Sequence, residues 1–299
     1  MFTSGERFIN HSIFLEVYLD TTATPLANLL ISFWSSTRAT ITNSMFYFDD
    51  YLPSSVSQFD AAIMIIASLG TSFLTAALGI GGGTALLVLL ALFLPPAALI
   101  PVHSFVQFGS NVGRLLIMIF EVNWKPFIPF CIGTIIGCCI AGLFVIQLPS
   151  FVIQLAVGFF ILWIVFAQMP AIPSKFVFLA GVVSSFSSMF IGATGNFVAA
   201  VVKTMKLQPV QHVATHSALA TFQHFVKSFV FGFVGFNFSE YLTLIFGMIV
   251  SGFIGTVVGR KVLTTFGASY FKPLLNVIFV VIAIKLLWDG FEHLLFSYY

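Results

Sequence analysis

The sequence predicts an all-α polytopic membrane protein with roughly eight to ten transmembrane helices, and two observations support this fold class. Of the 299 residues, 59% are hydrophobic and only 7% are charged, whereas a soluble domain carries about 25% charged residues. No charged residue occurs in 61–113 or in 126–174, and each stretch is long enough for two helical crossings of about 20 residues. This composition excludes a soluble enzyme, a nucleic-acid binder and a disulfide scaffold.

A hydropathy pass divides the chain into an N-terminal segment and ten apolar elements. Residues 1–60 hold eight of the charges and no long apolar stretch, so we expect an extracytoplasmic lead-in. Elements two and seven are short, and each follows a glycine-containing break, at Gly79–Gly83 and Gly192–Gly195. Half-helices or re-entrant hairpins are expected there, because irregular backbone is tolerated where it lines a cavity. The elements are roughly 61–79, 83–94, 97–120, 127–147, 150–168, 176–191, 195–205, 212–236, 241–259 and 270–288.

Basic residues between the elements predict sidedness. They follow the odd-numbered elements, and the connections after elements two, four, six and eight contain no Lys or Arg. Since cytoplasmic loops carry the excess of basic residues, the odd connections are predicted to be cytoplasmic and both termini extracytoplasmic, in the inner (plasma) membrane. The basic residues are Lys125, Lys175, Lys203, Lys206, Arg260, Lys261 and Lys272.

The chain also resembles itself. The matched positions are Val102-His103-Ser104 with Thr215-His216-Ser217 and Arg114 with Lys227, at an offset of 113, and Ile80-Gly81 with Ile191-Gly192, at an offset of 111. Each copy holds five elements, an odd number, so the second copy enters the membrane from the opposite face. The sequence therefore predicts two five-element inverted repeats, a plan of secondary transporters whose substrate site lies at the repeat interface. The predicted regions are 1–60, 61–170 and 171–299.

Elements three and eight carry the candidate site. In element three the polar residues fall within an arc of about 100°, so one helix face is polar. Such side chains are costly in hydrocarbon and usually face a bundle interior or an aqueous cavity. Two such faces, one from each repeat, are predicted to converge. The candidates are His103, Gln107, Asn111 and Arg114 in element three, and His216, Gln223, His224 and Lys227 in element eight.

The charge balance of this region predicts the sign of the ligand. From Ala61 to Trp288 the only acidic residues are Glu121 and Glu240, both in connections. A buried cation needs a partner, so we expect a small anion held by Arg114 and Lys227, because guanidinium suits oxyanions. The half-helix starts add backbone N–H groups, which favour negative charge. We therefore include in the predicted site the residues at these half-helix starts, which are Gly81, Gly82, Gly83, Gly192 and Thr194.

The expected partners are this anion and the lipid bilayer, with no cofactor, metal or nucleic acid. The sequence is compatible with a homodimer. It is also compatible with proton coupling through His103, His216 and His224, because histidine titrates near neutral pH. One alternative is a membrane-embedded metalloenzyme that uses the i, i+4 pair His212 and His216, although the core lacks the usual carboxylate ligand. A non-transporting subunit of a membrane complex is a further alternative.

Two sequence stretches resemble the sulfite exporter TauE/SafE family of membrane permeases. They are Leu78-Gly79-Ile80-Gly81-Gly82-Gly83, followed by an apolar run to Leu94-Pro95-Pro96, and Val122-Asn123-Trp124-Lys125. The resemblance spans roughly 61–290 and leaves the N-terminal segment outside. It implies a permease, and not an enzyme, that moves small anions such as sulfite or organosulfonates across the inner membrane, commonly by export.

Overall fold

The computed structural model describes residues 51–78, 81–145, 149–167, 171–192, 195–263 and 272–296. Ten α-helices and three short 3₁₀ turns make up this part of the chain, so the predicted all-α fold is confirmed. Residues 1–50 of the predicted N-terminal segment lie outside the described residues. The helices are α3 (Gln58–Leu78), α4 (Gly82–Leu90), α5 (Pro96–Ile117), α6 (Phe127–Val145), α7 (Ser150–Phe166), α8 (Val177–Ile191), α9 (Gly195–Lys203), α10 (Pro209–Phe233), α11 (Leu242–Leu263) and α12 (Lys272–Phe296).

Several of these helices are suited to a bilayer, and the chain is a multi-pass membrane protein. In the described part, four segments are long and apolar enough to cross a membrane: Gln58–Ala77, Phe127–Val145, Ser174–Ile191 and Phe238–Lys261. The helices α5 and α10 are comparably long, with 22 and 25 residues, but they carry the polar side chains of the candidate site.

The helices α4 and α9 are too short to span. Each has nine residues and is therefore about 13 Å long, less than half of a hydrocarbon core of about 30 Å. Glycine permits the sharp backbone turns beside them. Gly81 precedes α4 with φ +95°, and Gly192 ends α8 with φ +78°. The prediction of short, glycine-broken elements is thus confirmed.

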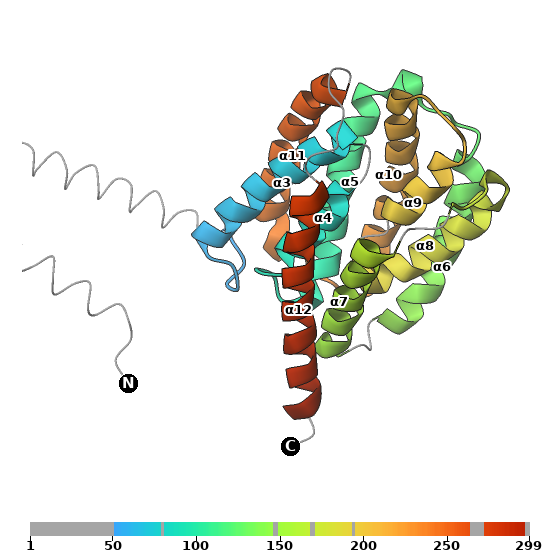
Figure 1. Cartoon of the computed structure of the whole chain (residues 1–299). Coiled ribbons are helices and arrows are strands. Elements are labelled where there is room, and N and C mark those ends of the chain that lie inside the picture. Colours follow the sequence, from blue (N-terminus) through green and yellow to red (C-terminus); the bar gives the residue numbers. More distant parts are fainter. Residues whose placement is uncertain are drawn as a thin grey trace, which may run out of the picture. The chain divides into compact units, whose positions relative to one another are not determined.

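Four helix pairs form the main packing contacts: α3 with α11, α6 with α8, α7 with α12, and α5 with α10 (Figure 1). Two of these pairs rest on glycines spaced four residues apart, a motif that lets helix backbones approach closely. Gly133 and Gly137 of α6 face the backbone of α8, and Gly255 and Gly259 of α11 face the backbone of α3. Close backbone contact therefore holds both outer pairs.

The pair α5 and α10 is antiparallel. Near the start of α5, Ser104 accepts a hydrogen bond from Ser228 near the end of α10, at 3.2 Å. Beyond the end of α5, the backbone N–H of Asn123 donates to Thr215 Oγ1 near the start of α10, at 2.9 Å. This register brings the middle of each helix, where the polar residues lie, against the middle of the other.

Candidate functional site

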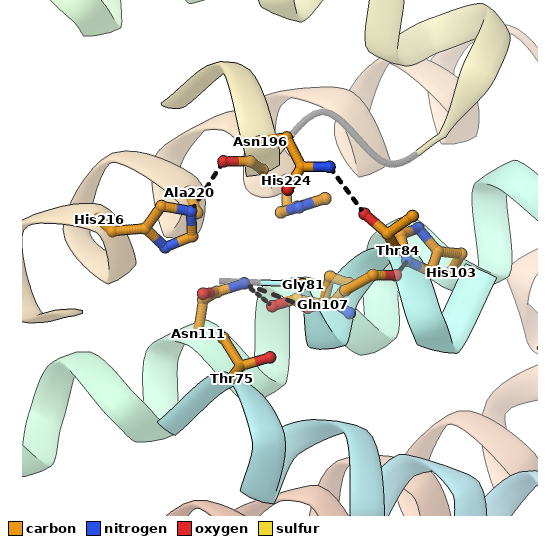
Figure 2. Close-up of a pocket in the computed structure, with 12 residues that line it drawn as sticks. Thr75, Gly81, Thr84, His103, Gln107, Asn111, Asn196, His216, Ala220 and His224 are labelled. Atoms are coloured by element: carbon orange, nitrogen blue, oxygen red, sulfur yellow. Dashed lines mark hydrogen bonds between the residues drawn. The ribbon is translucent and has the colours of Figure 1, made fainter. Parts of the chain in front are cut away.

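A buried cavity of about 30 Å³ lies among α3, α4, α5, α9 and α10. This volume is room for about two water molecules. Figure 2 shows His216 on one side of this space, His103 and Thr84 on the other, and Asn196 between them. The cavity is lined by Thr75, Gly81, Gly83, Thr84, His103, Gln107, Asn111, Gly195, Asn196, His216, Ala220 and His224.

A chain of oriented amides runs from Arg114 to the cavity wall on α5. Arg114 Nη1 donates to Asn111 Oδ1 at 2.8 Å. Asn111 Nδ2 in turn donates to the backbone oxygen of Gln107 at 2.7 Å and to Gln107 Oε1 at 3.4 Å. Because Gln107 Oε1 accepts from Asn111, its NH₂ group is left to face Gly83 and the cavity. These hydrogen bonds, which begin at the buried Arg114, orient the Gln107 amide so that its NH₂ group is a donor toward the cavity.

Two histidines make the same bond in the two copies of the predicted repeat. His103 Nε2–H of α5 donates to the Gly83 carbonyl oxygen at 2.8 Å. His216 Nε2–H of α10 donates to the Gly195 carbonyl oxygen at 3.0 Å. Each long polar helix is thereby tied to the first turn of a half-helix. The His224 ring lies edge-on to His103, with 6.0 Å between the ring centroids.

The two half-helices meet at the cavity. Asn196 Nδ2 of α9 donates to Thr84 Oγ1 of α4 at 3.3 Å (Figure 2). Both residues belong to first helical turns, where backbone N–H groups lack partners within the helix and the helix dipole is positive. The cavity therefore lies where two helix N-termini converge, an arrangement suited to an anion.

The structure brings together part of the predicted site. Seven predicted residues line the cavity: Gly81, Gly83, His103, Gln107, Asn111, His216 and His224. Five others do not line it: Gly82, Gly192, Arg114, Gln223 and Lys227. Thr194 lies outside the described residues. The predicted site did not include five lining residues, Thr75, Thr84, Gly195, Asn196 and Ala220. Gly195 lies in the second glycine break, and Thr84 and Asn196 directly follow the two breaks, so these three could have been found there.

Gln223 and Lys227 contact α8 instead of the cavity. Lys227 Nζ donates to the backbone oxygen of Gly192 at 2.8 Å and to that of Ser188 at 3.5 Å. It thus supplies a cationic donor where α8 ends, which the helix dipole favours. Gln223 Nε2 donates to the hydroxyls of Ser184 and Ser185 at 3.0 and 2.9 Å. These two residues hold α10 against α8.

The two buried cations lie on opposite sides of the cavity. Arg114 is 1% exposed and Lys227 is 0% exposed. Each lies seven residues beyond a lining residue, Gln107 or Ala220, which is about 10 Å along its helix. Because α5 and α10 are antiparallel, the two cations are displaced in opposite directions. Among the described residues, the salt bridge joins Lys285 and Asp289 of α12. Neither Arg114 nor Lys227 therefore pairs with a carboxylate in the described part of the chain.

Lys227→Met is expected to lower the thermal stability of the purified protein. The substitution leaves the carbonyl groups at the end of α8 without their donor, at a cost of about 1–3 kcal/mol. Thermal unfolding of detergent-purified protein measures the effect. Lys203→Met is the control, because Lys203 is an exposed lysine at the end of α9. Equal melting temperatures for both variants would contradict a capping role for Lys227.

Spanning helices, two half-helices and a buried polar cavity between them define the class of helical membrane transporters with interrupted helices. A family model described as Sulfite exporter TauE/SafE matches residues 64–286. The chain belongs to this family of transmembrane anion exporters, whose members are transporters and not enzymes. A search of curated proteins and a search of solved structures gave no match.

Proposed function

We propose that the chain is a secondary transporter that exports a small oxyanion, such as sulfite or a related sulfonate, across the inner membrane. One observation carries this proposal: the cavity presents N–H donors and is flanked by two buried cations without carboxylate partners among the described residues. A buried cation without a counter-charge is unfavourable, so an anion in the cavity lowers the energy of both. Family membership supports the same substrate class.

The anion accepts hydrogen bonds from the Gln107 amide and from the first-turn N–H groups of α4 and α9. Arg114 acts through Asn111, and Lys227 acts through its electric field, because neither lines the cavity. Their separation of about 20 Å prevents one small anion from contacting both. Since the cavity measures only about 30 Å³, sulfite is expected to bind more tightly than the larger sulfoacetate.

We further propose that 61–170 and 171–299 are inverted repeats, with both termini extracytoplasmic. Three matched features support the repeat: the half-helices α4 and α9, the His–Gly hydrogen bonds, and the packing of α3 on α11 and of α8 on α6. Rocking of such repeats around a shared site is a general route to alternating access. A shared cavity between α5 and α10 fits this mechanism.

Flux in liposomes tests the proposed function. Purified protein is reconstituted alone and assayed with sulfite, sulfoacetate, thiosulfate, sulfate and small carboxylates. Wild-type protein is expected to transport at least one sulfur oxyanion, and Gln107→Leu is expected to reduce the rate about tenfold or more, because it removes the cavity donor. Transport by the protein alone would also exclude the non-transporting subunit.

The matched control is Gln154→Leu on α7, which removes a glutamine outside the cavity lining. Its flux is expected to equal that of the wild type. Absence of flux for every anion, or equal flux of Gln107→Leu and Gln154→Leu, would contradict the proposed site.

A further inference from the structure

The cavity contains histidine nitrogens whose hydrogen-bonding capacity is unused. Nδ1 of His103 and Nδ1 of His216 have no hydrogen-bond partner among the described residues. Their side chains are 1% and 6% exposed, and both line the cavity. Buried polar atoms are usually paired, so these two atoms point to a ligand that completes them.

The hydrogen bonds of the opposite ring nitrogens determine what each Nδ1 can do. A backbone carbonyl oxygen only accepts, so Nε2 of His103, bonded to Gly83, and Nε2 of His216, bonded to Gly195, must each carry the hydrogen. In a neutral imidazole the other nitrogen is then an acceptor. The neutral cavity therefore directs two lone pairs at its ligand, and these lone pairs repel an oxyanion.

Resting on the proposed function, we infer that the cavity binds its anion together with a proton, which is held at Nδ1 of His103 or His216. The proton comes from the aqueous solution and forms an N–H bond at Nδ1. That N–H group then donates to an oxygen of the anion. No bond in the anion breaks, and the proton offsets one negative charge of the anion.

The surroundings of the two rings oppose a proton that arrives without an anion. The ring of His103 lies edge-on to that of His224 on α10, and the charge of Lys227 on α10 acts on it. The charges of His212 on its own helix and of Arg114 on α5 act on His216. The sequences of α4 and α8 contain no titratable residue, and α9 contributes only Lys203 at its end. Positive groups near the rings raise the energy of a lone imidazolium.

Each ligand therefore favours the binding of the other. An anion that binds alone is repelled by the Nδ1 lone pairs, and a proton that binds alone is repelled by the neighbouring cations. When both bind, the protonated Nδ1 donates to the anion, and the anion offsets the positive charge. Coupling of this kind is reciprocal. Where one proton accompanies each anion, the apparent Kd of the anion rises about tenfold for each unit increase in pH.

Calorimetric titration of the purified full-length protein tests the inference. Sulfate and sulfite are titrated in buffers of different ionisation enthalpy between about pH 5 and pH 8. The buffer dependence of the heat counts the protons taken up for each anion bound. After correction for ionisation of the free anion, wild-type protein is expected to take up about one proton, and its Kd to rise about tenfold per pH unit.

His103→Gln and His216→Gln test which of the two histidines holds the proton. Glutamine can still donate to the Gly83 or Gly195 carbonyl through its Nε2, but it cannot take up a proton. The double variant is expected to lose proton uptake and to show a Kd that changes less than about twofold per pH unit. His293→Gln, an exposed histidine near the end of α12 and outside the cavity lining, is expected to behave as wild type.

The outcomes are distinguishable. Anion binding without proton uptake in the wild type would overturn this inference and leave the proposed function standing. Uptake with sulfite that persists in the double variant would show that neither His103 nor His216 holds the proton, and would also overturn it. Absence of binding for every anion would overturn both proposals.

Discussion

Gly82→Ala is expected to prevent accumulation of the folded protein. A Cβ atom at this position would lie 1.9 Å from the backbone oxygen of Thr71 and 2.0 Å from Thr75 Oγ1. The obstacle is partly backbone, which cannot move aside as a flexible side chain can. The expected cost of such overpacking is about 3 kcal/mol or more. The yield of monodisperse protein on size exclusion, the melting temperature and anion flux measure the effect.

Gly70→Ala is the matched control in α3. No atom lies within 4 Å of a Cβ built at Gly70, and alanine favours a helix interior by about 0.5–1 kcal/mol over glycine. This variant is expected to be as stable as the wild type or slightly more so. Wild-type yield and melting temperature for Gly82→Ala would contradict the close packing of α4 against α3.

The second large effect is expected at the interface of α6 and α8. In the double variant Gly133→Ala/Gly137→Ala, the new Cβ atoms would lie 2.2 Å from the backbone oxygen of Phe178 and 2.2 Å from that of Val182. The two helices would have to separate, and transmembrane helix association depends on such close packing. We expect a cost of about 3 kcal/mol or more, measured as a lowered melting temperature and loss of flux.

The interface of α11 and α3 provides an internal comparison. In Gly255→Ala/Gly259→Ala, the Cβ atoms would lie 2.1 Å from the backbone oxygen of Leu69 and 2.5 Å from that of Phe73. Both double variants are expected to be destabilised to a similar extent. Gly232→Ala in α10, where the nearest atom is 3.6 Å away, is the control. Sensitivity at one interface alone would contradict the proposed repeat symmetry.

Both glycine motifs are visible in the sequence. Gly133-Thr-Ile-Ile-Gly137 and Gly255-Thr-Val-Val-Gly259 have the same spacing and nearly the same composition. The sequence alone does not pair the glycines of α6 with those of α11. Spacing shows that a helix can approach a neighbour closely. Which neighbour it approaches is decided by the packing of the whole bundle.

Three of the four predicted site residues of α5 line the cavity, and two of the four of α10 do. His103, Gln107 and Asn111 do line the cavity, whereas Gln223 and Lys227 contact α8. An arc of about 100° on a helix is wide enough to touch two neighbours. Sequence periodicity therefore identifies the face but not which part of it borders the cavity.

The sequence by itself determined the membrane class, the helical elements of the described residues, the two short glycine-broken helices and the family. Hydropathy, charge and glycine breaks act locally along the chain, which is why a sequence pattern reveals them. Only the tertiary structure decided that Thr84 and Asn196 join the two half-helices, and that the two histidines turn Nε2 toward backbone carbonyls. Those arrangements depend on contacts between segments more than 100 residues apart in one case and about 20 in the other. The direction of a side chain across such a contact is set by packing and hydrogen bonding between helices. A pattern along the sequence does not show which helices are neighbours, so it does not show that direction.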